Sequence, residues 1–181
     1  MTNSASTQAL SIPTLKLELV FQIRINFKER VSFLPTTPMG GRAYVPVTGG
    51  EIWGPRLQGR VIPSSGADFA RGRQDGCSEL NAHYMLEASD GTPIYIYNRG
   101  YIYGRQEDGR PISPEVRDKA RAEGKPGFAG WTSPNPYFII TPIFDAPIGP
   151  HDWLTRTIIV GKGERHADPD HSIFTYYAVQ P

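Results

Sequence analysis

The stretch from Tyr95 to Tyr103, YIYNRGYIY, repeats phenol and guanidinium groups at a spacing of two. In an unbroken β-strand, residues of one parity share one face. The residues of odd parity here are Tyr95, Tyr97, Arg99, Tyr101 and Tyr103. If this face lines an interior, its phenols and its guanidinium surround a planar or anionic ligand by stacking and hydrogen bonding.

Two alternatives to an interior position stay open for these tyrosines. Ile94 and Ile96 lie on the opposite face and compete for the core, which would leave the tyrosines on an outer, half-wet surface. Alternatively, Gly100 forms a bulge that exchanges the two faces halfway along the strand.

Asp68, His83 and Asp145 are the candidates for acid and base catalysis. Asp68 either caps the preceding Ser-Ser-Gly turn through backbone N–H groups or lies at the mouth of a pocket, where desolvation raises its pKa for proton transfer. Asp145 follows the segment YFIITPIF and has the same two interpretations. His83 shares a face with Glu79 and Glu87, as an exposed histidine would, but histidine is also a side chain suited to exchanging protons in catalysis.

Several classes of protein are disfavoured by what the chain lacks. Its 19 basic and 18 acidic residues give a net charge of +1, so neither nucleic acid nor an acidic membrane is an expected partner. Its four histidines lack close metal-ligand spacings and its one cysteine, Cys77, has no activating neighbour, so we expect no metal. Neither a nucleotide-binding loop nor a nucleophile elbow occurs, and we expect no cofactor. With no signal peptide in the polar N-terminus and no apolar run of membrane-spanning length, the expected location is the cytoplasm.

The element that must position these residues is predicted most clearly by Leu15 to Lys28, LKLELVFQIRINFK. Apolar and polar residues alternate along it, and only Val20 breaks the pattern. This period indicates an antiparallel strand with one face in water. At about 45 Å, such a strand is too long for a flat sheet and must follow a curved one.

Further strands are expected across most of the chain, separated by turns rich in glycine and proline. In order they are Ala43–Val47, Arg56–Ile62, Glu79–Ala88, Pro93–Tyr103, Tyr137–Asp145, Trp153–Gly161 and Ser172–Val179. Gly49-Gly50 and Gly54-Pro55 are expected to form a turn, and the segment after Val160 a turn-rich connection. The prediction is therefore an all-β fold, a single antiparallel lipocalin-like barrel of about seven or eight strands.

Two segments are expected to stand apart from the barrel domain, which spans residues 15–181. Residues 1–14 form a disordered or loosely attached N-terminal segment. Residues 105–133 form an insertion that is either a lid or a solvated excursion. Within it, Ser113 as N-cap, Pro114 in the first turn and Gly124 at the end predict one short helix.

Three ordered blocks resemble the DUF3237 family, also called UPF0311. They are TGGEIWGPRLQGRVIPSSGADF (48–69), HYMLEASDGTPIYIYNRG (83–100) and PYFIITPIFDAPIGPHDWLTRTIIVGKG (136–163). The resemblance implies a calycin-like antiparallel β-barrel and lends little function. Trp53, Phe69, His83, Asp145 and Thr155 depart from the family pattern, which hints at a specialised ligand.

Two functions follow from a barrel with room for one small molecule. The first is a cofactor-independent lyase, isomerase, hydratase or cyclase that holds a small aromatic or polycyclic molecule and moves a proton. The alternative is a lipocalin-like binding or carrier protein, and a homo-oligomer, with a dimer favoured, is expected in either case. Bare scaffolding is less favoured. The expected ligand contacts are Trp53, Arg56, Tyr84, Tyr95, Tyr97, Arg99, Tyr101, Trp131, Phe144 and Trp153.

Overall fold

The protein is described by a computed structural model that covers residues 13–28, 31–34, 37–123, 136–167 and 169–181. Its strands are β1 (Lys16–Phe27), β2 (Val31–Leu34), β3 (Gly41–Trp53), β4 (Gly59–Val61), β5 (Ala67–Asp68), β6 (Arg71–Gly72), β7 (Ser78–Ala88), β8 (Pro93–Tyr103), β9 (Tyr137–Ile140), β10 (Ile143–Asp145), β11 (Ile159–Ala167) and β12 (Asp170–Gln180). The α-helix α1 (Pro114–Ala122) and the 3₁₀-helix η1 (Asp152–Thr155) complete the described elements.

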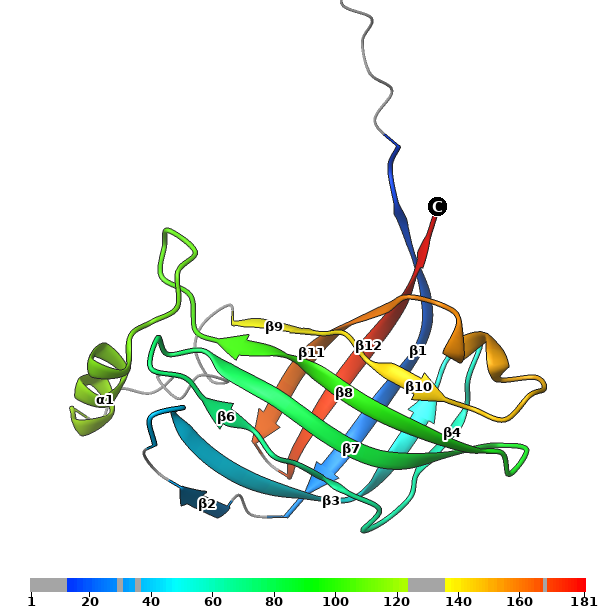
Figure 1. Ribbon diagram of the computed structural model, residues 1–181, viewed down its shortest axis with the longest axis horizontal. Coiled ribbons are helices and arrows are strands. Elements are labelled where there is room, and N and C mark those ends of the chain that lie inside the picture. The colour runs from blue at the N-terminus through cyan, green and yellow to red at the C-terminus, as the bar shows by residue number, and fades with distance from the viewer. Residues whose placement is uncertain (1–12, 29–30, 35–36, 124–135, 168) are drawn as a thin grey trace, which may run out of the picture.

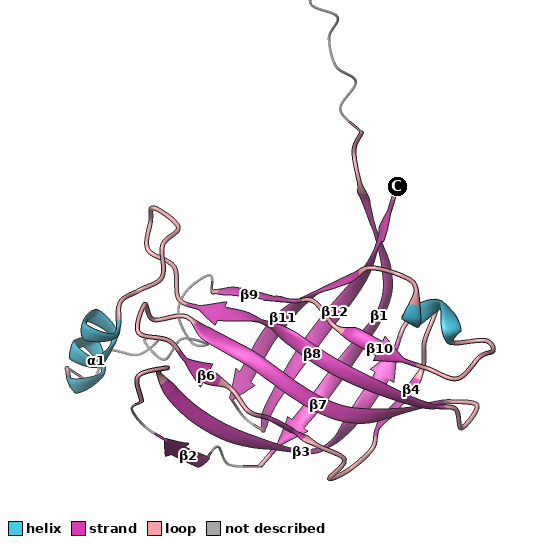
Figure 2. Cartoon of the chain, viewed as in Figure 1, coloured by secondary structure: helices cyan, strands magenta, loops and turns pink. Residues whose placement is uncertain are grey.

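The strands close into one antiparallel barrel, as the alternating patterns predict (Figure 1). Each strand of the ring pairs with the next in the order β1, β3, β4, β7, β8, β9, β11 and β12, and β12 returns to β1. The short strands β5 and β6 bridge β3 and β7, β2 adds to β3, and β10 adds to β8. The fold class expected from the sequence, an all-β barrel with one short α-helix, is confirmed, and both helices lie outside the wall (Figure 2).

The barrel is filled by the apolar side chains that alternate inward along its strands. The largest fully buried side chains include Phe21, Ile23, Leu86, Ile96 and Tyr176. Phe21 stacks on Tyr176 with ring centroids 4.7 Å apart. Burial of each large side chain contributes about 1.5–3 kcal/mol, so this interior supplies the main stabilisation of the fold.

β1 contains a bulge at the one residue that breaks its alternation. The register with β12 shifts between Leu19 and Phe21, so Val20 and Phe21 are both buried. After the bulge, Ile23 and Ile25 continue the buried face. Before the bulge the faces are exchanged, so Leu17 and Leu19 are exposed. The expectation that all the apolar residues of this strand share one buried face is therefore wrong for its first part.

Other strand bounds also differ from the prediction. β3 runs through Gly49-Gly50, where a turn was expected, because pairing with β1 continues at both residues; their φ values of 131° and 158° are positive ones that glycine adopts readily. The expected strand Tyr137–Asp145 is divided between β9 and β10 at Pro142, which has no N–H for the ladder. The segment at Trp153 is the helix η1, and β11 extends to Ala167 through the expected turn-rich connection.

Helix α1 begins as predicted. The Val116 N–H donates to the Ser113 hydroxyl at 3.4 Å, and Pro114 occupies the first turn. Most of the predicted lid segment after this helix, together with Trp131 and residues 1–12, lies outside the described residues. None of the described helices has the length and apolar character that a membrane span requires.

Candidate functional site

The two ends of the barrel interior differ in accessibility. At one end, inward-facing Phe21, Phe144 and Leu154 are fully or almost fully buried. At the other end, inward-facing Phe27 and Leu80 are only half-buried although they pack against the same core. These two side chains lie at the end where β1 and β8 finish and β7 begins, and we call this the Asp68 end.

Three polar side chains lie in the interior behind the Asp68 end: Tyr84 on β7, Asn98 on β8 and Tyr176 on β12. Ser172 on β12 is a further buried polar residue. Tyr84 is 1%, Asn98 3% and Tyr176 0% exposed. The Asn98 Nδ2–H donates to the Tyr84 hydroxyl at 3.5 Å. The Asn98 Oδ1 and the Tyr176 hydroxyl are buried and have no partner in hydrogen-bonding geometry, although the Tyr84 hydroxyl and the Asn98 amide lie close enough to Tyr176 to influence its pKa. Such unpaired groups are rare in native interiors, so they call for a functional explanation.

Burial also determines the protonation of the two phenols. Desolvation raises the pKa of Tyr84, the Tyr176 hydroxyl and Asn98 amide lower it in part, and the Asp68 carboxylate raises it further. Desolvation likewise raises the pKa of Tyr176 well above its ordinary value. Both hydroxyls therefore stay protonated at neutral pH and can act as hydrogen-bond donors.

Asp68 faces the interior from the short strand β5. It pairs with Val45 on one side and Ala82 on the other, and both of those residues belong to the buried face. Its Oδ1 accepts the Asn81 N–H of β7 at 2.8 Å. The N–H that the Asp68 carboxylate accepts here belongs to β7 and not to the preceding Ser-Ser-Gly turn, and the carboxylate is close enough to raise the pKa of Tyr84.

Arg165 supplies a guanidinium at the same end of the barrel. It follows Gly161 and Gly163 on the inner face of β11, and its side chain is 20% exposed. The guanidinium lies 4.5 Å from the ring centroid of Phe27, and its Nη2–H donates to Asp170 at 2.6 Å. Arg165 was missed because its segment has the composition of a loop.

The other two missed residues carried a usable signal. Asn98 is a polar residue on the face of Ile94, Ile96 and Ile102, and Tyr176 lies between inward-facing Phe174 and Ala178. Polar groups on a buried face need partners, so an interruption of an apolar face is itself an indication of a site.

The tyrosines of β8 do not line the barrel interior. The pairing with β7 continues without a shift from Pro93 to Ile102, so Gly100 does not exchange the faces. Ile94 and Ile96 fill the core, whereas Tyr95 and Tyr97 are half-buried on the outer face and Arg99 and Tyr101 are exposed there. The predicted interior position is therefore corrected, because the two isoleucines gain more from burial than the amphipathic tyrosines do.

His83 and Asp145 also lie on the outer face, and therefore apart from Asp68. His83 stacks on Tyr97 with ring centroids 4.1 Å apart, and its Nε2 is 3.1 Å from the Asn81 Oδ1. Asp145 is exposed at the end of β10, where it pairs with Tyr95. The structure does not bring together the three acid–base candidates that the sequence indicated.

The remaining predicted contacts lie at the other end of the barrel. Phe144 is buried against Phe21, with centroids 6.1 Å apart, and belongs to the core. The Arg56 guanidinium lies 3.8 Å from the ring centroid of Trp153. Trp53 is on the outer face, where its Nε1–H donates to Gln22 at 2.8 Å. Of the predicted ligand contacts that the structure describes, Tyr84 is the one that lies inside the barrel near Asp68.

The described residues offer no group of three histidine, cysteine, aspartate or glutamate side chains able to hold a metal ion. Cys77 is buried, and burial raises the pKa of its thiol to about 11. A thiol that stays protonated at neutral pH is a poor nucleophile.

Comparisons with known proteins agree with the barrel and with the resemblance seen in the sequence. A UPF0311 protein of Rhodopseudomonas palustris is 31% identical over 162 residues, which make up 86% of this chain and 92% of that protein. A beta-barrel like protein from Acinetobacter baumannii AYE, 28% identical, superposes with a TM-score of 0.73 over 95% of this chain and 100% of its own.

A crystal structure of an enzyme from Penicillium herquei has the same fold, with a TM-score of 0.65 and 19% identity over 95% of this chain and 100% of its own. The family described as "Protein of unknown function (DUF3237)" matches residues 15–179. This match, with the 31% identity to a UPF0311 protein, shows that the chain belongs to the DUF3237 family.

Proposed function

We propose that the protein is a cofactor-independent enzyme that holds a small aromatic or polycyclic molecule at the Asp68 end of the barrel and moves a proton on it. The observation that carries this proposal is the pair of unpartnered buried groups, the Asn98 Oδ1 and the Tyr176 hydroxyl. A ligand hydroxyl placed between them would satisfy both groups, because it can donate to the Asn98 Oδ1 and accept from the Tyr176 hydroxyl; otherwise both groups stay desolvated at a cost of about 1–3 kcal/mol each.

The chemical step assigns one role to each kind of group. The Asp68 carboxylate takes a proton from a C–H or O–H group of the ligand, and the electron pair left behind moves onto a ligand oxygen. The hydroxyls of Tyr84 and Tyr176 donate hydrogen bonds to that oxygen as negative charge develops on it. The same step begins an isomerisation, an elimination or a ring closure, so the proposal covers these related reaction types.

The surrounding apolar side chains support the choice of an aromatic ligand. Phe138 and Phe174 face inward beside this cluster with ring centroids 5.2 Å apart, and they offer edges and faces for packing. The Penicillium herquei enzyme, at 19% identity, supports only the statement that this fold can host catalysis.

A second candidate is a binding or carrier protein without catalysis. It is favoured by the neutral character of the Tyr84, Asn98 and Tyr176 groups, since a phenol and an amide can anchor a ligand without transferring a proton. The two functions differ in what Asp68 contributes.

The experiment begins with native mass spectrometry of the purified protein, to identify any molecule that accompanies it, and with a panel of naphthols as defined probes. Asp68→Asn is compared with Asp145→Asn, the same substitution on the outer face. We expect Asp68→Asn to abolish turnover and to change the dissociation constant by less than about threefold, with Asp145→Asn unchanged in both. Binding without turnover in the wild-type protein would instead establish the carrier function.

A further inference from the structure

The outer face of the barrel contains a cavity of about 340 Å³. It extends over β3, β6, β7 and β8. The side chains that give it its chemistry are Arg42, Arg71, Glu79, Tyr97, Arg99 and Tyr101.

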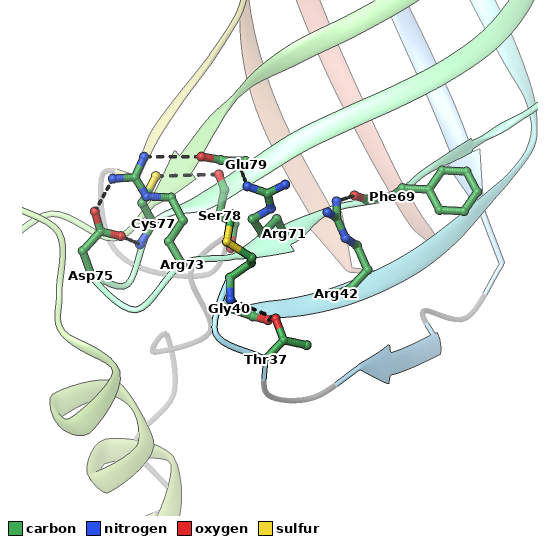
Figure 3. A network of polar contacts seen from close by, with 11 residues as sticks. Thr37, Gly40, Arg42, Phe69, Arg71, Arg73, Asp75, Cys77, Ser78 and Glu79 are labelled. Carbon is green, nitrogen blue, oxygen red and sulfur yellow. Dashed lines mark hydrogen bonds and ion pairs between the residues drawn. The ribbon is translucent and has the colours of Figure 1, made fainter.

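Strand register brings these side chains together although they are far apart in the chain. Arg42 on β3 pairs with Arg71 on β6, Arg71 pairs with Glu79 on β7, and Glu79 pairs with Tyr101 on β8. Paired residues in an antiparallel sheet project from the same face. Arg42, Arg71 and Glu79 accordingly extend to one side of the wall (Figure 3).

The cavity carries more positive charge than its carboxylate can neutralise. Glu79 is shared, since it lies 3.5 Å from an Arg71 nitrogen and 3.4 Å from an Arg73 nitrogen (Figure 3). The Arg42 Nη1–H donates to a neutral acceptor, the Phe69 carbonyl, at 2.9 Å. Within the part of the chain that the structure describes, no carboxylate lies within 4.0 Å of the Arg42 or Arg99 guanidinium. Both are therefore available to an external anion.

The Tyr97 ring lies beside these guanidinium groups, and its position is fixed by contacts with His83. Tyr97 stacks on His83 with an interplanar angle of 11°. The His83 ring is held in turn by the Tyr95 hydroxyl at its Nδ1 and by Asn81 at its Nε2. The Arg99 guanidinium lies 5.5 Å from the Tyr97 ring centroid, so charge and ring are adjacent.

We propose that this outer cavity binds a small aromatic acid, with the carboxylate on Arg42 and Arg99 and the ring against Tyr97 and Tyr101. Guanidinium forks match carboxylates in geometry, and their charge-assisted hydrogen bonds are about twice as strong as neutral ones. The volume lies within the range of small-molecule sites, about 300–1,000 Å³, and is larger than a simple inorganic anion requires. The site lies on the opposite face of the wall from Asp68, and His83 serves it as a positioning residue.

The test uses 2-naphthoate as probe and its neutral isostere 2-naphthamide as control, with binding measured by calorimetry and mapped by amide chemical shifts. We expect saturable binding of 2-naphthoate with shifts on β7 and β8. Arg42→Gln and Arg99→Gln should each weaken it at least about tenfold, since each removes a charge-assisted pair. Arg60→Gln, which removes an outer-face arginine paired with Glu87, is the matched control and should leave affinity unchanged.

Each other outcome overturns the proposal. Equal binding of 2-naphthamide would show that no anion is recognised, and equal binding of inorganic phosphate would show that the ring contributes nothing. Absence of saturable 2-naphthoate binding would remove the site altogether. Asp68→Asn and Tyr176→Phe, which alter the interior, should leave 2-naphthoate affinity unchanged, so failure here is distinguishable from failure of the proposed function. Thermal unfolding of each variant verifies that it is folded.

Discussion

Tyr84 and Tyr176 are the same residue type in the same interior, but their hydroxyls have different hydrogen bonding. The Tyr84 hydroxyl accepts a hydrogen bond from the Asn98 amide, whereas the Tyr176 hydroxyl has no partner in hydrogen-bonding geometry. A buried hydroxyl that is not hydrogen-bonded destabilises the folded state, because it gives up water without compensation. The two phenols should therefore respond oppositely to removal of the oxygen.

We predict that Tyr176→Phe leaves the free energy of unfolding of the ligand-free protein unchanged or raises it by up to about 1 kcal/mol. Tyr84→Phe should lower it by about 1 kcal/mol, because the Asn98 amide then loses its acceptor. Urea unfolding measures both values. If Tyr176→Phe were the more destabilising of the two, the Tyr176 hydroxyl would have a structural partner and the argument for a ligand there would fail.

Asp90, in the turn after β7, provides a prediction for pH. The Thr92 N–H donates to its Oδ1 at 3.0 Å and His151 contacts its Oδ2 at 2.9 Å. Thr92, as the larger cause, and His151 lower the pKa of Asp90 to about 2. Since the unfolded-state pKa is about 3.9, the stabilisation is complete above that pH and is lost as the pH falls through about 2.

Asp90→Asn should accordingly reduce stability near neutral pH and show a smaller further loss between about pH 5 and about pH 2 than the wild-type protein. The urea midpoint, measured across this range, reports the difference. Parallel curves for the two proteins would contradict the assignment of the acid-sensitive contribution to Asp90.

At the scale of the element, β8 shows how much of a strand can be predicted from the alternation of its residue types. The period of two predicted the strand from Pro93 to Tyr103 with its bounds, and it separated the isoleucines from the tyrosines. It did not say which set faces inward, since both are large and partly apolar. That choice depends on how tightly the closed barrel packs, which is a property of several strands together.

In β11, by contrast, the local composition led to a wrong prediction, because a loop was expected where the strand continues. Its charged and glycine-rich sequence is typical of a loop, but it is held between β9 and β12. Gly161 and Gly163 face inward there, where a Cβ at Gly163 would lie 2.7 Å from the Phe138 ring. Glycine is required at both positions because large side chains of a neighbouring strand occupy the space that a Cβ would need. The local sequence contains no sign of this contact between strands. Arg165, the charged residue at the Asp68 end, was missed for the same reason.

This packing predicts the effect of enlarging one glycine. Gly163→Ala should lower the free energy of unfolding by about 1–3 kcal/mol, because the added methyl group forces the Phe138 ring out of position. Gly72→Ala is the matched control, since nothing lies within 4 Å of a Cβ there, and it should change stability by less than about 0.5 kcal/mol. Denaturant unfolding compares the two, and equal effects would exclude contact with Phe138 as the cause.

At the scale of the whole molecule, the sequence predicted a closed barrel and the family, whereas the two candidate sites had to be found from the structure. Asp68 and Tyr84 were named for the interior, but their grouping with Asn98 and Tyr176 requires strands from both ends of the chain. The homodimer, the cytoplasmic location and the role of the 105–133 insertion stay predictions.

The barrel wall between the two sites is a single sheet layer. Along β7 and β8, Tyr84 adjoins His83 and Asn98 adjoins Tyr97, with one member of each pair on either face. A ligand that shifts these strands on one side must shift them on the other, so we expect heterotropic linkage. An acid in the outer cavity should change the affinity of the interior ligand, by about fivefold if the coupling is weak, and the interior ligand should change that of the acid by the same factor. Titration of each ligand in the presence and absence of the other would measure both affinity changes. Equal changes would show that the barrel wall couples the two sites.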